Sequence, residues 1–79
     1  MYMFIRVQTE SLDTLYPCTK LKVHLDEKGD PKEVLLFRDK EAILGIRPKI
    51  DPPTFLYIMN DRGETIDTRS YGYDKDEEK

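Results

Sequence analysis

The sequence predicts an all-β fold in which five or six short antiparallel strands form a small barrel or sandwich. Two observations lead to this prediction. Apolar residues recur at every second position in several segments, and clusters of turn-forming residues separate these segments about every 8 to 12 residues. The chain of 79 residues has no repeat and no linker-like stretch. We therefore expect a single small β domain over residues 1–73, followed by a disordered acidic tail over residues 74–79.

The first two strands are expected over residues 3–9 and 19–25. Successive side chains of a strand point to opposite faces, and the second segment alternates in this way between apolar and polar residues. Its apolar positions are Leu21, Val23 and Leu25, and its polar positions are Lys20, Lys22 and His24. We expect the stretch between the two strands, residues 11–17, to be a connection with room for one helical turn.

A turn over residues 26–31 and a third strand over residues 32–38 are expected next. An α+β alternative stays open at this point. The run from Asp30 to Glu33 also has the pattern of a helix start, and a helix could then extend over residues 31–44. We prefer the strand because four consecutive apolar residues at 34–37 would surround a helix instead of forming one stripe along it.

The last strands are expected over residues 42–47, 54–59 and 64–70. Three prolines exclude regular strand pairing from the stretch between the first two of these segments. The turn before the last segment contains Gly63, which can take a left-handed backbone conformation and form a bulge. We expect the last segment to be an edge strand with Ile66 facing inward, because polar residues surround that isoleucine.

Two of the expected strands, within residues 34–37 and 55–59, are apolar on both faces. An antiparallel strand with one face in water alternates apolar and polar residues. The second face of these two strands must therefore be covered, and a chain of this length has few residues left to cover it. We therefore predict that a partner protein or a second copy of the chain covers it. The predicted interface consists of Leu35, Phe37, Leu56, Ile58, Tyr71 and Tyr73.

The charge distribution argues against sequence-independent binding of nucleic acid. The chain has 16 acidic and 13 basic residues, a net charge of −3, and no basic cluster of the kind that binding the phosphate backbone requires. We see no leader peptide and no membrane span in the sequence, and the single cysteine fits a reducing compartment. A cytoplasmic protein is expected.

The residues needed for catalysis are sparse. Cys18 and His24 are the only thiol and imidazole, and six residues along an extended strand separate them by about 20 Å. The acidic residues near the turns do not match a calcium loop, and the four glycines match no phosphate-binding motif. We expect no catalytic, cofactor-binding or metal-binding residue, no cofactor and no small-molecule substrate.

These observations predict a small, non-enzymatic protein that binds another protein or associates with itself. The alternative is a single-stranded nucleic-acid binder on a barrel of the OB or SH3 type, in which tyrosines near Arg69 would stack on bases. The absence of a basic surface makes this alternative the weaker of the two.

Overall fold

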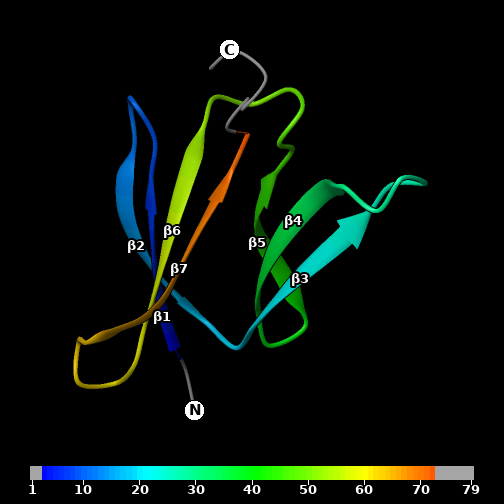
Figure 1. Cartoon of the computed structure of the whole chain (residues 1–79). Helices are drawn as coiled ribbons and strands as arrows, with labels where there is room; N and C mark the ends of the chain where they lie inside the picture. Colours follow the sequence, from blue (N-terminus) through cyan, green and yellow to red (C-terminus); the bar gives the residue numbers. More distant parts are fainter. Residues whose placement is uncertain (1–2, 73–79) are drawn as a thin grey trace.

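A computed structural model describes residues 3–72, which form seven strands in two antiparallel sheets (Figure 1). Sheet A has the order β2-β1-β6-β7, and sheet B has the order β3-β4-β5. The strands of sheet A are β1 (Met3–Gln8), β2 (Asp13–Cys18), β6 (Thr54–Met59) and β7 (Thr65–Tyr71). The strands of sheet B are β3 (Lys20–Leu25), β4 (Pro31–Arg38) and β5 (Glu41–Ile46). The all-β prediction is confirmed in its sandwich form, without a closed barrel.

The sequence prediction missed β2, which occupies most of the stretch expected to be a connection. This strand pairs with β1 along its whole length, from Met3 opposite Cys18 to Gln8 opposite Asp13. It was hard to recognise because Leu15, its one aliphatic residue, points away from the core and is 51% exposed. Pro17 is tolerated because β2 is the edge strand of sheet A, where a missing N–H disrupts no ladder.

The chain passes directly from β2 into β3 at Thr19, so one bent segment belongs to both sheets (Figure 1). Hydrogen bonds of Thr19 connect this bend to the end of β4. Its backbone N–H donates to the carbonyl oxygen of Phe37 at 2.7 Å, and its hydroxyl oxygen accepts from the N–H of Asp39 at 2.8 Å. Asp39 takes a φ of 59° in the turn that follows β4. These bonds set how the two sheets meet.

The core lies between the facing sides of the two sheets. Its buried members come from β1, β2, β4, β5 and β6, and they are Ile5, Val7, Cys18, Val34, Leu36, Ile46, Leu56 and Ile58. The placement of Leu56 and Ile58 corrects the sequence prediction, which had put them on a second face covered by another chain. Sheet B covers them instead, so the face of β6 that points away from the core carries Phe55, Tyr57 and Met59.

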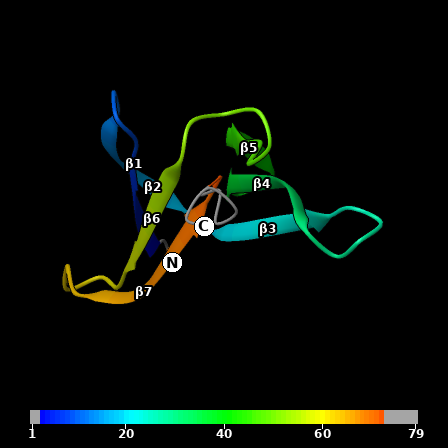
Figure 2. The ribbon, with the colours of Figure 1, turned by 45° about the horizontal axis from the view of Figure 1, so that its top comes forward.

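The segment for which a helix had stayed open is a β-hairpin arm, so the α+β alternative is wrong. Val34 and Leu36 are buried, whereas Leu35 and Phe37 point to the other face and are half-buried. The hairpin of β3 and β4 extends away from the body of the molecule (Figure 2). Its turn closes with Gly29 at a φ of 88° and with an Asp26 side chain that accepts from the backbone N–H groups of Lys28 and Asp30.

Strand β7 is an edge strand, as predicted, but Ile66 does not face inward. The register of β7 against β6 shifts between Ile58 and Met59, so Ile66 has no partner of its own and is 63% exposed. This extra residue forms the expected bulge. Gly63, in the turn before β7, has a φ of 83°, which confirms the predicted left-handed position.

Candidate functional site

The outer face of sheet A, the side that points away from sheet B, is the surface of most interest. Residues on this face alternate with the buried ones, and the strand register brings them into neighbouring rows. They are Phe4, Arg6 and Gln8 of β1, Asp13, Leu15 and Pro17 of β2, Phe55, Tyr57 and Met59 of β6, and Thr68 and Ser70 of β7. The face contains three aromatic side chains but no lysine and no glutamate.

No other element of residues 3–72 covers this face, because sheet B packs on the opposite side. Phe55 and Leu15 are exposed, at 38% and 51%, and Phe4, Tyr57 and Met59 are half-buried. In the register, Phe4 lies opposite Met59, and Arg6 lies opposite Tyr57. The centre of the outer face of sheet A is therefore an apolar, aromatic surface that remains in contact with water.

The polar groups on the outer face of sheet A bond to one another. The guanidinium of Arg6 donates to both carboxylate oxygens of Asp13, at 2.7 and 2.6 Å, and the hydroxyl of Tyr57 donates to Gln8 Oε1 at 3.2 Å. The bond to Asp13 raises the pKa of Arg6, and the same bond lowers the pKa of Asp13. The face is thus electrically neutral in sum, and the side chains of its charged residues, of Tyr57 and of Gln8 already have hydrogen-bond partners.

The outer face of sheet B is different, because side chains of the same sheet cover its apolar residues. The ammonium of Lys20 lies 5.1 Å from the centre of the Phe37 ring. Leu35 lies opposite Gly45, and a Cβ at position 45 would be 3.4 Å from Leu35 Cδ2, so the leucine leans over the glycine. Lys22 lies opposite Leu35 on the other side. This face therefore combines charge with shielded apolar surface.

The structure does not bring together the five predicted interface residues that it describes. Leu56 and Ile58 lie in the core, Leu35 and Phe37 lie on the outer face of sheet B, and half-buried Tyr71 packs against the core. Tyr73 lies outside the described residues. Sequence reasoning missed Phe55 and Tyr57. The signal was present in the doubly apolar segment itself, but which of its faces was the core could not be read from one strand.

Cys18 and His24 are not placed to act together. Cys18 is completely buried, and its burial raises the pKa of the thiol. His24 is exposed, lies opposite Glu33, and belongs to the outer face of sheet B. A thiol held protonated inside the core is a poor nucleophile, and this imidazole lies on the opposite side of sheet B from the core.

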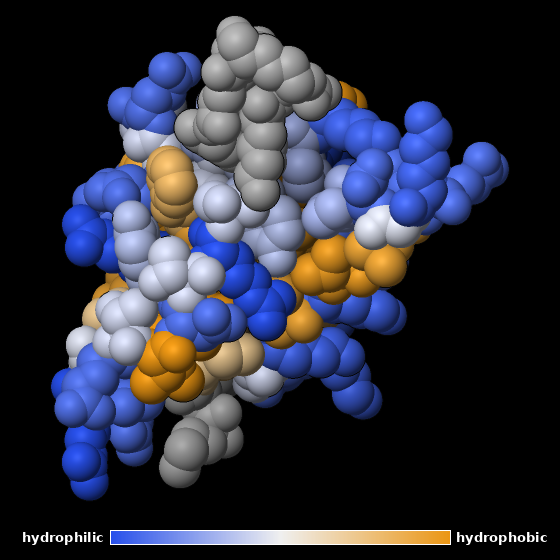
Figure 3. Space-filling model, viewed as in Figure 1, coloured by the Kyte–Doolittle hydropathy of each residue, from blue (hydrophilic) through white to orange (hydrophobic). Residues whose placement is uncertain are grey.

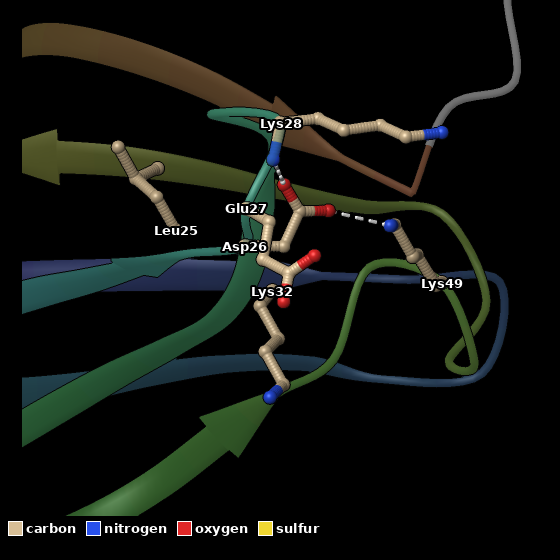
Figure 4. Close-up of a pocket in the computed structure, with 6 residues that line it drawn as sticks. All are labelled: Leu25, Asp26, Glu27, Lys28, Lys32 and Lys49. Carbon is tan, nitrogen blue, oxygen red and sulfur yellow. Dashed lines mark hydrogen bonds and ion pairs between the residues drawn. The ribbon is translucent and has the colours of Figure 1, made fainter.

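An open depression of about 480 Å³ lies at the end of the β3–β4 hairpin (Figure 4). It is lined by Leu25, Asp26, Glu27, Lys28, Lys32 and Lys49. Lys49 donates to Asp26 Oδ2 at 2.6 Å, and this bond, together with backbone donors, lowers the pKa of Asp26 to about 2. The depression is held together by this hairpin-to-loop contact, and within the described residues it contains no buried polar group left to receive a ligand.

Comparisons with protein families, curated proteins and solved structures found no match for this chain. Among residues 3–72, no three acidic, histidine or cysteine side chains are grouped so that they could hold a metal ion. The same residues contain no helix with the length and apolar character needed to cross a bilayer. The view in Figure 3 shows a mainly hydrophilic surface on which the apolar areas are separate from one another.

Proposed function

We propose that this protein is a small, non-enzymatic interaction module that binds a protein partner through the outer face of sheet A. One observation carries the proposal: the central strands of that sheet present Phe4, Phe55, Tyr57 and Met59 to water, with no covering element among residues 3–72. Surfaces of this composition, rich in aromatic residues, methionine and arginine and poor in lysine and glutamate, are typical of protein interfaces.

The arrangement of the polar groups supports the same proposal. Buried polar groups cost free energy unless they keep hydrogen-bond partners. On the outer face of sheet A, Arg6 is already paired with Asp13, and Tyr57 is already bonded to Gln8. A partner that covers this face therefore buries mostly aromatic and aliphatic surface and leaves no charge without a partner.

The experiment compares two variants that each place one carboxylate on an outer face. Phe55→Glu changes the outer face of sheet A, and His24→Glu changes the outer face of sheet B; both positions are exposed. Each protein is used, after nuclease treatment, to capture partners from its native cell extract. We expect Phe55→Glu to lose a partner that the wild type and His24→Glu both retain, because a carboxylate at the centre of the interface would be desolvated without a partner.

Retention of every captured protein by a folded Phe55→Glu variant would contradict the proposal. Circular dichroism and thermal unfolding of both variants serve as the folding control. Since Phe55 lies outside the core between the two sheets, its replacement leaves that core unchanged and the fold should remain intact.

A single-stranded nucleic-acid binder is the second candidate, favoured by the three aromatic side chains on one sheet face, since bases stack on such side chains. The neutral charge of the face argues against it. Binding of a fluorescent single-stranded oligonucleotide that weakens steeply with added salt would favour this candidate over a protein partner.

A further inference from the structure

Strand β7 is a free edge of sheet A, and it is more exposed than any other strand of residues 3–72. It pairs with β6 on one side only, and each of residues 65–70 is exposed. In Figure 2 the first part of β7, next to the turn from β6, lies at the margin of the molecule. An edge of this kind presents backbone N–H and C=O groups to which another strand can bond.

One hydrogen bond shows which backbone groups face the free edge. The N–H of Thr68 donates to Oδ1 of the neighbouring Asp67 side chain at 2.9 Å, so it points away from β6. In an antiparallel strand, the outward-facing residues alternate with those that bond to the neighbour. Ser70, two residues further along the regular part of the strand, therefore also presents its backbone groups to the edge.

The charges on β7 are arranged symmetrically about Thr68. Asp67 precedes it and Arg69 follows it, and within the chain the two side chains form an ion pair of 3.2 Å. If two copies of β7 pair in antiparallel fashion about Thr68, Asp67 of each copy lies directly opposite Arg69 of the other. These contacts fall at the non-hydrogen-bonded positions, where opposing side chains come closest.

We infer that two copies of this chain associate edge to edge through β7, with the two-fold axis at Thr68. The register is specific. A shift of two residues in one direction would place Asp67 opposite Asp67, and in the other direction Arg69 opposite Arg69. Parallel pairing in register would also place like charges side by side. Opposite charges across a strand pair are favourable and like charges are unfavourable.

Few hydrogen bonds are lost when the copies pair. The N–H of Thr68 exchanges the Asp67 carboxylate for the carbonyl oxygen of Thr68 in the other copy. The Asp67 carboxylate loses these two donors, the N–H of Thr68 and the guanidinium of Arg69 in the same copy, and gains the guanidinium of Arg69 in the other copy. The contact is a small one, so we expect association at high micromolar concentration and not a tight dimer.

This inference does not depend on the proposed function, but the two fit together. A two-fold axis perpendicular to the sheet keeps the outer faces of both copies on the same side. The pairing would therefore produce one continuous sheet whose outer face carries the aromatic residues of both copies. A partner could then contact two neighbouring copies of the outer face of sheet A.

Sedimentation of the full chain over a range of concentrations tests the inference. Asp67→Arg places a second guanidinium opposite Arg69 of the other copy, and Arg69→Asp places a second carboxylate opposite Asp67 of the other copy. Each variant should weaken the dimer about tenfold or more, since two attractive pairs become repulsive. Asp61→Arg makes the same charge change at an exposed residue of the preceding turn and should leave the dimer unchanged.

A mixture of the two charge variants is the more specific test. When an Asp67→Arg copy pairs with an Arg69→Asp copy, the two guanidinium groups of the first lie opposite the two carboxylates of the second. Both cross-strand pairs are then again of opposite charge, so heterodimers should form where neither variant alone associates. The double variant Asp67→Arg/Arg69→Asp should likewise dimerise as the wild type does. Failure of the double variant to associate would overturn the proposed register.

Thr68→Pro blocks the edge without altering the charges. The N–H group that proline lacks donates, in the wild type, to the Asp67 side chain and not to β6. The strand should therefore still pair with β6. A folded, monomeric Thr68→Pro variant is expected. A wild type that stays monomeric, or a dimer that survives both Thr68→Pro and the charge variants, would refute the edge pairing. A dimer that Phe55→Glu alone abolishes would instead place self-association on the outer face of sheet A.

Discussion

The outer faces of the two sheets have different surfaces, although their central strands have similar sequences. Both central strands, β4 and β6, carry large apolar residues on the side that points away from the core. On sheet B, Lys20 covers the ring of Phe37, and Leu35 leans over Gly45. On sheet A, the neighbours of Tyr57 and Phe55 are Arg6, Gln8, Thr68 and Ser70, and Arg6 is engaged with Asp13.

The difference shows that neighbouring strands decide whether an apolar residue on a sheet surface is shielded. A lysine has a long aliphatic stem that can lie on apolar surface while its charge remains in water. Sheet B places two lysines on β3 beside the apolar residues of β4. Sheet A has none on its outer face. Leu35 and Phe37 on sheet B are therefore half-covered by neighbouring side chains, whereas Phe55 and Leu15 on sheet A remain exposed.

The largest effect should come from truncating a side chain on the buried face of β6, compared with one on its outer face. Leu56→Ala should reduce the free energy of unfolding by about 2–5 kcal/mol, because Leu56 is fully buried and its removal leaves a cavity. Phe55→Ala, next to it on the outer face, should cost clearly less, about 1 kcal/mol, because Phe55 is 38% exposed and lies outside the core. Urea unfolding of both variants measures this. Equal losses would show that something in the folded chain also covers the outer face of sheet A.

Removing the cover from the outer face of sheet B should have a smaller effect. Lys20→Ala deletes both the aliphatic stem and the charge that lies over the Phe37 ring, and it should cost about 0.5–1 kcal/mol in unfolding free energy. Lys40→Ala, in the exposed turn between β4 and β5, is the matched control and should be neutral. If the two lysine variants unfold alike, the contact between Lys20 and Phe37 contributes nothing to stability.

A third effect is confined to acid pH. Hydrogen bonds from Lys49 and from backbone N–H groups lower the pKa of Asp26 from 3.8 to about 2. Since the folded-state pKa lies below the unfolded one, the stabilisation is complete above about pH 4 and is lost as the pH falls towards 2. Asp26→Asn should therefore flatten the decline of the unfolding midpoint between these values. An unchanged decline would show that the contact between the hairpin and the loop does not form in solution.

The smallest effect expected is a gain. Gly45→Ala places a Cβ at an ordinary contact distance of 3.4 Å from Leu35, and the φ angle of Gly45 is not positive. The alanine restricts the unfolded chain and adds a contact, so it should stabilise the protein by about 0.5 kcal/mol. A rise in the thermal unfolding midpoint checks this. A clear loss of stability would mean that Leu35 cannot yield to the added methyl group and that the outer face of sheet B is packed tightly at this point.

Local patterns were enough to predict most of the strands. Alternation along β1 and the first part of β3, the turn at Gly29 and the left-handed Gly63 are properties of a few neighbouring residues, and the structure bears them out. Leu25, expected on the inner side of β3 with Leu21 and Val23, is instead 60% exposed, because the register shifts between His24 and Leu25. The all-β fold follows from these segments because alternating apolar residues can be buried only against another sheet. Strand β2 escaped prediction because its Leu15 faces outward and its Pro17 is acceptable only at an edge.

The tertiary structure alone decided which side of each strand became the core. A segment such as residues 55–59 is apolar on both faces, so its own sequence favours neither. Pairing with Ile5 and Val7 of β1, on the side that sheet B covers, assigned Leu56 and Ile58 to the core and left Phe55 and Tyr57 outside. Pairing register is a property of two strands at once, and a change of one residue moves every side chain to the opposite face. The sequence by itself therefore determined that this chain has more apolar strand surface than one core face requires. Only the packing of the two sheets decided where that surface lies.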